Sequence, residues 1–202
     1  YPFFNLRFPQ IARALLLYRY RRLEGAREYA HEHGYRGTMY PWQTADNGHE
    51  ETQIIHFNPV SGKWDPDLSS RQRHVSIAVA YSVWEYFYCT GDLEFINEYG
   101  AEILVLTTRF WASIAEFDES DGRYHIRGVM GPDEFHEKYP DADAQAGGLN
   151  DNSYTNILVG WLMHKTIETL EYLPKKDMRI LVEKTGFKPQ EKELWNDIVS
   201  RM

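Results

Sequence analysis

The sequence predicts an all-α protein in which long helices form a toroid, with an inner ring of helices shielded by an outer ring. Several segments carry apolar residues on every side of a helical wheel, which is typical of helices that other helices bury. Long polar loops rich in Gly and Pro separate these segments, and we expect the loops to line the mouth of the toroid. The pattern leaves room for one short hairpin.

The first third of the chain predicts helical structure followed by two irregular loops. Apolar residues recur with helical spacing over residues 8–22, where Pro9 fits a first turn, and the pattern continues weakly over residues 24–32. Residues 40–51 predict a polar loop around one tryptophan. Residues 57–67 have turn signals at nearly every step and predict either a hairpin or an inserted loop.

Two mostly buried helices are expected next, over residues 71–88 and 93–117. The tight turn Thr90-Gly91-Asp92 joins them, so they should form an antiparallel αα-hairpin. Cys89 lies in the apolar run of the first helix and is expected in the core. Because it is the only cysteine, no internal disulfide can form, and a reducing compartment, the cytoplasm, is favoured.

The C-terminal part of the chain predicts one strand, one exposed loop and three helices. In order, these are a short strand at residues 124–128, an exposed loop at 138–148, a helix that starts within 150–156 and runs to 173, and amphipathic helices at 176–185 and 189–201. Pro174 ends the first of these helices.

Composition excludes several classes of partner. The net charge of −8 argues against nucleic acid, because phosphates require clustered Lys and Arg. No apolar stretch approaches the ~20 residues of a membrane span, so no membrane partner is expected. The six Trp and fourteen Tyr suit either a large aromatic core or a sugar-binding cleft, in which ring faces stack on pyranoses.

Residues 128–137 are the strongest candidate for a catalytic loop. After a Gly-X-X-Gly-Pro turn, four ionisable side chains fall within five positions: Asp133, Glu134, His136 and Glu137. Glycine and proline fix the backbone onto which these groups are crowded, and in this way a loop can hold a carboxyl group at a set angle in a cleft. We therefore expect Glu134 to be a proton donor.

A carboxyl group donates a proton at neutral pH only when burial or nearby negative charge raises its pKa. Asp133 and Glu137 would supply the charge, and Phe135 would supply some burial. The alternative is that Asp133 and Glu137 form surface ion pairs with Lys138 or Arg127.

Other chemistries fit the sequence less well. The motif lacks the His-X-X-X-His spacing of a helical metal site, and the chain has no pair of cysteines, so no metal is expected. A serine nucleophile elbow is also missing from the sequence. Glycoside hydrolysis ordinarily uses two carboxylates, but one acid suffices when the nucleophile is already anionic. Inorganic phosphate is such a nucleophile, and no other cofactor is implied.

Three separated motifs resemble glycoside hydrolase family 65, which contains the maltose, kojibiose and trehalose phosphorylases. The motifs are Gly131-Pro132-Asp133-Glu134-Phe135-His136-Glu137, Asn152-Ser153-Tyr154-Thr155-Asn156, and the loop at residues 40–51 with the upstream Gly25-Ala26-Arg27-Glu28. They occur in the family's order, and the similarity covers about residues 7–173. The resemblance implies that the helices form part of an (α/α)6 barrel.

The resemblance also implies an inverting phosphorolysis of a glucose disaccharide. Glu134 would protonate the glycosidic oxygen while phosphate attacks the anomeric carbon, giving β-glucose 1-phosphate. Trp42 and Gln43 match residues that face the sugar receiving the proton. The full set of residues expected to bind substrate is Trp42, Gln43, Asp46, His74, Ser76, Asp133, His136 and Glu137. The partners are then the disaccharide and phosphate, and the longer protein is expected to be a homodimer.

The sequence departs from the family pattern, and neither the linkage nor the acceptor follows from it. Residues 138–148 look like an insertion, and Gln43 replaces a frequent Glu. The family's glucose-gripping Trp-Asp pair should precede Tyr1, and its phosphate-binding loops should follow Met202. We therefore expect residues 1–202 to be an incomplete barrel domain, truncated at both ends and inactive alone.

Two other functions stay open. An inverting α-glucosidase on the same barrel would need a second carboxylate about 6.5–9.5 Å from Glu134 to activate water. A noncatalytic sugar-binding helical domain would keep its function when Glu134 is replaced by Gln.

Overall fold

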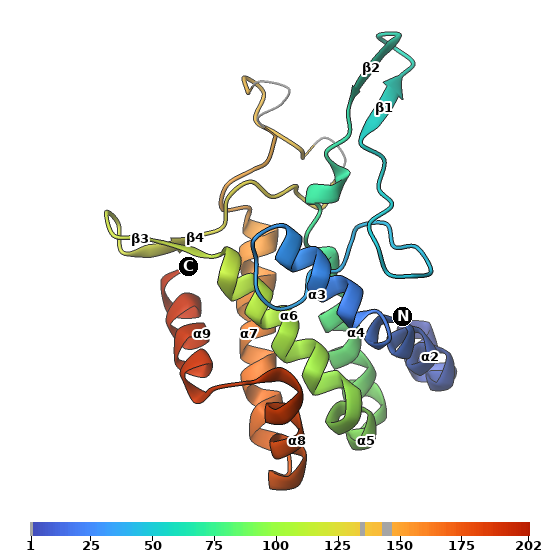
Figure 1. Ribbon diagram of the computed structural model, residues 1–202, viewed down its shortest axis with the longest axis vertical. Coiled ribbons are helices and arrows are strands. Elements are labelled where there is room, and N and C mark those ends of the chain that lie inside the picture. The colour runs from blue at the N-terminus through green and yellow to red at the C-terminus, as the bar shows by residue number, and fades with distance from the viewer. Residues whose placement is uncertain (1, 134–135, 143–146) are drawn as a thin grey trace.

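The computed structural model describes residues 2–133, 136–142 and 147–202, and helices dominate it (Figure 1). The helices are α1 Pro2–Arg7, α2 Pro9–Tyr20, α3 Leu23–Glu32, α4 Val75–Thr90, α5 Leu93–Phe95, α6 Ala101–Ile114, α7 Ser153–Tyr172, α8 Lys175–Thr185 and α9 Pro189–Arg201. The predicted all-α class is confirmed, and so are the expected positions of most helices.

Helix α6 forms the centre of the helical body. It packs against α4 and α7 on either side and also contacts α8 and α9. Its side chains are buried around most of its circumference, including Phe110 and Trp111, which are both 0% exposed. A helix with apolar residues on nearly every side gains burial free energy only when neighbours surround it, and this helix is surrounded.

Helices α4 and α6 form the expected αα-hairpin, but the connection is more elaborate than a single tight turn. Gly91 ends α4 with a left-handed backbone (φ 67°), and the Asp92 carboxylate accepts a hydrogen bond of 2.9 Å from the Phe95 amide. Short α5 and a π-helical turn at Ile96–Gly100 then lead into α6. The second helix ends at Ile114, three residues before the predicted end.

The described residues form two hairpins, whereas the sequence left room for one. Strands β1 Ile55–Asn58 and β2 Lys63–Pro66 pair antiparallel, which settles the choice between hairpin and inserted loop. Strands β3 Glu116–Asp118 and β4 Arg123–His125 form the second pair. The strand expected at residues 124–128 overlaps β4, whereas residues 116–117 were expected in a helix, because a strand of three residues is too short to show an alternating pattern.

The long loops gather at one end of the helices. Figure 1 shows the β1–β2 hairpin and the chain between β4 and α7 at the same end of α4, α6 and α7. Helix α7 begins there, with the Asn152 side chain accepting a hydrogen bond of 3.1 Å from the Thr155 amide, as the capping pattern predicted. This end of the helical body therefore corresponds to the expected mouth of the toroid.

The prediction that Cys89 lies in the core is wrong, because its side chain is exposed. Tyr81 and Tyr88 on the same helix are also 45% and 76% exposed. Helix α4 thus has one solvent-facing side, which the sequence did not show because Tyr and Cys count as apolar in a helical-wheel pattern. None of the described helices is long and apolar enough to cross a membrane.

Candidate active site

Residues from several segments line one pocket of about 580 Å³, here called the cleft. Its walls come from the loop at residues 40–51, from the β1–β2 hairpin and the segment after it, and from the loop at residues 128–137. The lining residues are Trp42, His56, Asp67, Ser69, Gln72, Met130, Pro132, Asp133 and Glu137. The fold therefore brings together two motifs that lie about 90 residues apart in the sequence.

Trp42 is held in the cleft wall by the carboxylate of Glu50. One Glu50 oxygen accepts a hydrogen bond of 3.1 Å from the Trp42 amide, and the other accepts bonds from the Gln43 amide (3.3 Å) and the Thr52 amide (2.9 Å). A single charged side chain thus closes the loop. The Trp42 side chain stays 36% exposed and available to a ligand.

The His74 ring packs against the side chain of Trp42. Its ring makes edge contacts with Trp42 and with Tyr154 of α7, both with centroids 5.8 Å apart. The residue is only 9% exposed, and burial lowers the pKa of His74, so the ring is neutral at neutral pH. His74 does not line the cleft itself. Tyr154, which the sequence analysis did not select, completes this aromatic group.

Of the residues that the structure describes, three acidic side chains line the cleft: Asp133, Glu137 and Asp67. Partial burial alone would raise the pKa of Asp67, but hydrogen bonds from Ser69 and Gln53 outweigh burial and lower it. Asp67 therefore stays ionised near neutral pH. Negative charge in such a cleft favours the protonated form of any further carboxyl group placed among these residues.

The turn that carries the acidic motif is closed by its own backbone. The Gly131 amide donates to the His136 carbonyl at 2.9 Å, and the His136 amide donates to the Asp133 carbonyl. The His136 side chain packs against Gly131, where an added Cβ would lie 2.7 Å from the His136 Cβ. Glu134, the predicted acid, and Phe135 lie outside the described residues.

Five predicted substrate-binding residues are not part of the cleft lining: His74 and His136, described above, and Ser76, Asp46 and Gln43. Ser76 is fully buried, and its hydroxyl accepts a hydrogen bond of 2.9 Å from the Tyr40 amide, which fixes the chain just before Trp42. Asp46 is exposed at the tip of its loop, beyond the bridge between Thr44 and Glu50. Gln43 is exposed beside Trp42.

Six residues of the lining were not predicted to bind substrate: His56, Asp67, Ser69, Gln72, Met130 and Pro132. Four of them, His56, Asp67, Ser69 and Gln72, lie in the β1–β2 hairpin or the segment after it. Only the tertiary fold brings this part of the chain next to the acidic loop. An adjoining pocket of about 310 Å³ shares His56 and Glu137 with the cleft and extends to Lys138. The Asp-X-Ser turn at Asp67 was a local signal that could have drawn attention to this segment.

Arg127 was one of two possible ion-pair partners for Asp133 and Glu137, but its contacts lie elsewhere. Its guanidinium contacts Glu116 at 2.9 Å and Asp118 at 3.4 Å, both on β3. Arg127 therefore forms its ion pairs with the β3–β4 hairpin, while Asp133 and Glu137 line the cleft.

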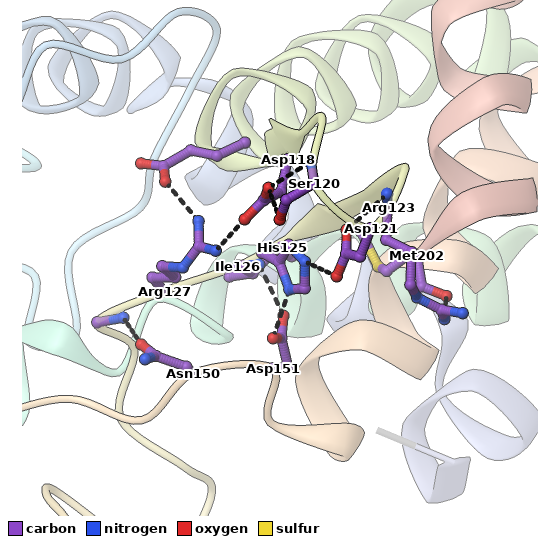
Figure 2. A network of polar contacts seen from close by, with 12 residues as sticks. Asp118, Ser120, Asp121, Arg123, His125, Ile126, Arg127, Asn150, Asp151 and Met202 are labelled. Carbon is purple, nitrogen blue, oxygen red and sulfur yellow. Dashed lines mark hydrogen bonds and ion pairs between the residues drawn. The ribbon is translucent and has the colours of Figure 1, made fainter.

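Asp118, Asp121 and His125 lie close enough to share one metal ion, with ligand atoms within 4.8 Å of one another. Both ring nitrogens of His125, however, already face carboxylates, Asp121 at 3.0 Å and Asp151 at 2.7 Å (Figure 2). Such a ring is held as a cation that donates two hydrogen bonds, which disfavours metal binding. None of the three residues lines the cleft.

Comparison with known proteins places this arrangement in a family. The model of the glycosyl hydrolase family 65 central catalytic domain matches residues 1–202. An uncharacterised glycosyl hydrolase of Mycobacterium tuberculosis is 48% identical over the whole chain, and the trehalose 6-phosphate phosphorylase of Lactococcus lactis is 45% identical over 84% of it. The chain spans 15% and 22% of the length of these two relatives.

A solved structure gives the same result for the fold. A protein from the human microbiome assigned as a kojibiose phosphorylase superposes on the whole chain with a TM-score of 0.78 and 26% identity, and the chain spans 26% of that protein. This likeness agrees with a portion of an (α/α)6 barrel. The chain belongs to glycosyl hydrolase family 65, within the family's central catalytic domain.

Proposed function

We propose that this chain forms part of the catalytic centre of an inverting α-glucoside phosphorylase. The observation that carries the proposal is that Trp42 and the described ends of the acidic motif, Asp133 and Glu137, line one cleft. An aromatic ring beside several carboxylates suits a sugar, since the ring can stack on a pyranose face while the carboxylates accept hydroxyl hydrogens.

In the proposed reaction, Glu134 gives its proton to the glycosidic oxygen as the bond from that oxygen to the anomeric carbon breaks. Phosphate attacks the opposite face of the anomeric carbon and forms the new C–O bond, so an α-glucoside gives β-glucose 1-phosphate and a free acceptor sugar. Phosphate is a co-substrate, and no other cofactor is required. A general acid of this kind must hold its proton until transfer, and negative charge close to a carboxyl group favours its protonated form.

The names of relatives indicate the substrate class. They act on trehalose 6-phosphate, kojibiose and maltose, and one is a 1,2-alpha-glucosylglycerol phosphorylase. We propose an α-glucoside with a small acceptor for this protein, with residues 1–202 as an incomplete portion of the barrel, and a cytoplasmic homodimer as the complete protein.

The experiment is a turnover assay of the full-length protein with and without phosphate. The panel is trehalose, trehalose 6-phosphate, maltose, kojibiose and nigerose. We expect phosphate-dependent cleavage of one of them. Glu134→Gln should lower kcat by at least about 100-fold with little change in KM, because the proton is needed only in the transition state. Glu119→Gln, in the exposed turn of β3–β4, is the matched control and should change neither constant.

A hydrolase is the second candidate, and the ionised state of Asp67 in the cleft favours it. Asp67 is an ionised carboxylate in the cleft, and an inverting glucosidase uses such a group as the base that takes a proton from the attacking water. In that case sugar release would be indifferent to phosphate, and Asp67→Asn would abolish it. Phosphate-dependent turnover that survives Asp67→Asn would exclude the hydrolase.

A further inference from the structure

The imidazole of His125 joins two segments that are 30 residues apart. Its Nδ1 lies 2.7 Å from an Asp151 carboxylate oxygen, and its Nε2 lies 3.0 Å from Asp121, as Figure 2 shows. Asp121 belongs to the turn between β3 and β4, whereas Asp151 lies just before the cap of α7. The His125 side chain is 17% exposed, so these contacts are partly shielded from water.

Asp151 is also bound to the chain that leads from β4 toward the cleft. Its second carboxylate oxygen accepts a hydrogen bond of 3.1 Å from the Ile126 amide, and its own amide donates to the Ile126 carbonyl at 2.8 Å. Among the described residues, Asp151 is the only non-glycine residue with positive φ, at 50°. A left-handed backbone is unfavourable for such a residue, and here three contacts hold it in place.

The pairing continues from Asp151 to the cleft wall. The Gly128 amide donates to the Asn150 side chain at 3.2 Å, and Val129 and Leu149 exchange backbone hydrogen bonds of 3.1 and 2.7 Å. Met130, the next residue, lines the cleft, as do Pro132 and Asp133. Hydrogen bonds within a few residues therefore link Asp151 to this wall, and the Arg71 carbonyl holds the Met130 amide from another side.

We propose that Asp151 and His125 are positioning residues for the reaction in the cleft, and that they fix the wall formed by Met130, Pro132 and Asp133. This inference rests on the proposed function, because the reaction that the wall serves is the proposed glycoside cleavage. Misplacing a binding wall by about 1 Å costs up to roughly 100-fold in rate.

The contacts between His125 and Asp151 depend on pH, because the imidazole of His125 can gain or lose a proton. The groups that face the ring are Asp151 before α7, Asp121 in the hairpin turn, and Asp118 on β3, which is shared with Arg127. The hydrogen bond to Asp151 raises the pKa of His125; limited burial opposes it and Asp121 adds to it. Below the usual histidine pKa near 6.5, the protonated ring therefore donates hydrogen bonds to both Asp151 and Asp121. As pH rises through the raised pKa of His125, the ring loses one proton and with it one of these two hydrogen bonds.

The test compares three variants of the full-length protein: Asp151→Ala, Asp151→Asn and Asp121→Asn. Asn at position 151 keeps an acceptor for the Ile126 amide and tolerates positive φ, so it should rescue much of the loss. We expect kcat to fall by about 100-fold, about 10-fold and less than about 2-fold respectively, with KM for the glycoside changing less. Asp121→Asn is the matched control, since it removes the other carboxylate from the same ring.

Equal loss in Asp151→Asn and Asp121→Asn, or no loss in Asp151→Ala, would overturn the proposal. If Asp151→Ala does not fold by circular dichroism, the comparison of the two Asn variants decides. Amide hydrogen exchange of Val129 and Met130 gives a readout without activity: it should accelerate in Asp151→Asn and stay unchanged in Asp121→Asn. Unchanged exchange in both contradicts positioning, even if the wild-type protein shows no phosphate-dependent turnover and the proposed function itself fails.

Discussion

Among single residues, the shape of the cleft depends on side chains that lie outside its lining. Glu50 is the clearest case, because its carboxylate accepts hydrogen bonds from the backbone amides of Trp42, Gln43 and Thr52. Hydrogen bonds to a charged acceptor contribute more than neutral ones, so one residue can order the whole loop.

Replacing Glu50 by Ala should release Trp42 from the cleft wall. We expect KM for the glycoside to rise by about 10-fold, equivalent to about 1.4 kcal/mol, with kcat nearly unchanged, because a binding contact is lost in the ground and transition states alike. Steady-state kinetics of the full-length protein measure both constants. Glu51→Ala, at the exposed neighbour, should leave them unchanged; a fall in kcat alone would contradict this role for Glu50.

Gly148 has a backbone conformation and a close neighbour that should not tolerate a larger side chain. Its φ is 115°, and an added Cβ would lie 2.5 Å from the Gly128 Cα. Gly148→Ala should therefore reduce the free energy of unfolding by about 3 kcal/mol or more. Gly186→Ala is the control, since Gly186 also has positive φ but no atom within 4 Å of the added Cβ, and it should cost only about 1–2 kcal/mol. Equal losses in denaturant unfolding would show that the close approach is unimportant.

At the scale of elements, an ion pair joins α6 to the C-terminal helices. Arg109 binds Glu191 through two hydrogen bonds of 2.6 and 2.9 Å and donates a third to the Thr185 carbonyl at the end of α8. Partial burial alone would raise the pKa of Glu191, but hydrogen bonds from Arg109 and the Lys188 amide outweigh burial and lower it. The pair therefore stabilises the folded protein whenever Glu191 is ionised.

Because the folded pKa of Glu191 is lowered, its contribution is complete above the unfolded value of about 4.3 and is lost as pH falls through the folded value. Glu191→Gln should reduce the free energy of unfolding at pH 7 by roughly 1–3 kcal/mol and flatten its fall in acid. Urea unfolding between pH 7 and pH 3 tests this. Glu171→Gln, which breaks the more exposed pair with Lys192, should cost less than about 1 kcal/mol.

The elements that could be predicted are those with local signals. The Asn152 cap and the Gly91 turn fixed the ends of two helices, and periodicity located α2, α8 and α9. Of the β3–β4 hairpin, β4 overlaps the strand expected at residues 124–128, whereas β3 was missed because a strand of three residues carries no periodic signal. Likewise, Trp42 and Asp133 could be placed in the site from their motifs, whereas His56 and Gln72 reach it only through the fold of a distant hairpin.

At the scale of the whole molecule, the chain spans 15% to 26% of the proteins compared with it. We therefore expect the isolated 202-residue chain to show no turnover under conditions where the full-length protein is active. A side-by-side assay on the preferred glycoside measures this. Turnover by the isolated chain at a rate comparable to the full-length protein would contradict the proposal that residues 1–202 are an incomplete barrel.

If the cleft belongs to an inverting phosphorylase, the first sugar phosphate released must be the β anomer. Proton NMR should follow the full-length protein acting on its α-glucoside in phosphate buffer. We expect β-glucose 1-phosphate as the first sugar phosphate, and no such signal from Glu134→Gln within the same time. An α-glucose 1-phosphate signal, or free glucose formed at the same rate without phosphate, would contradict it.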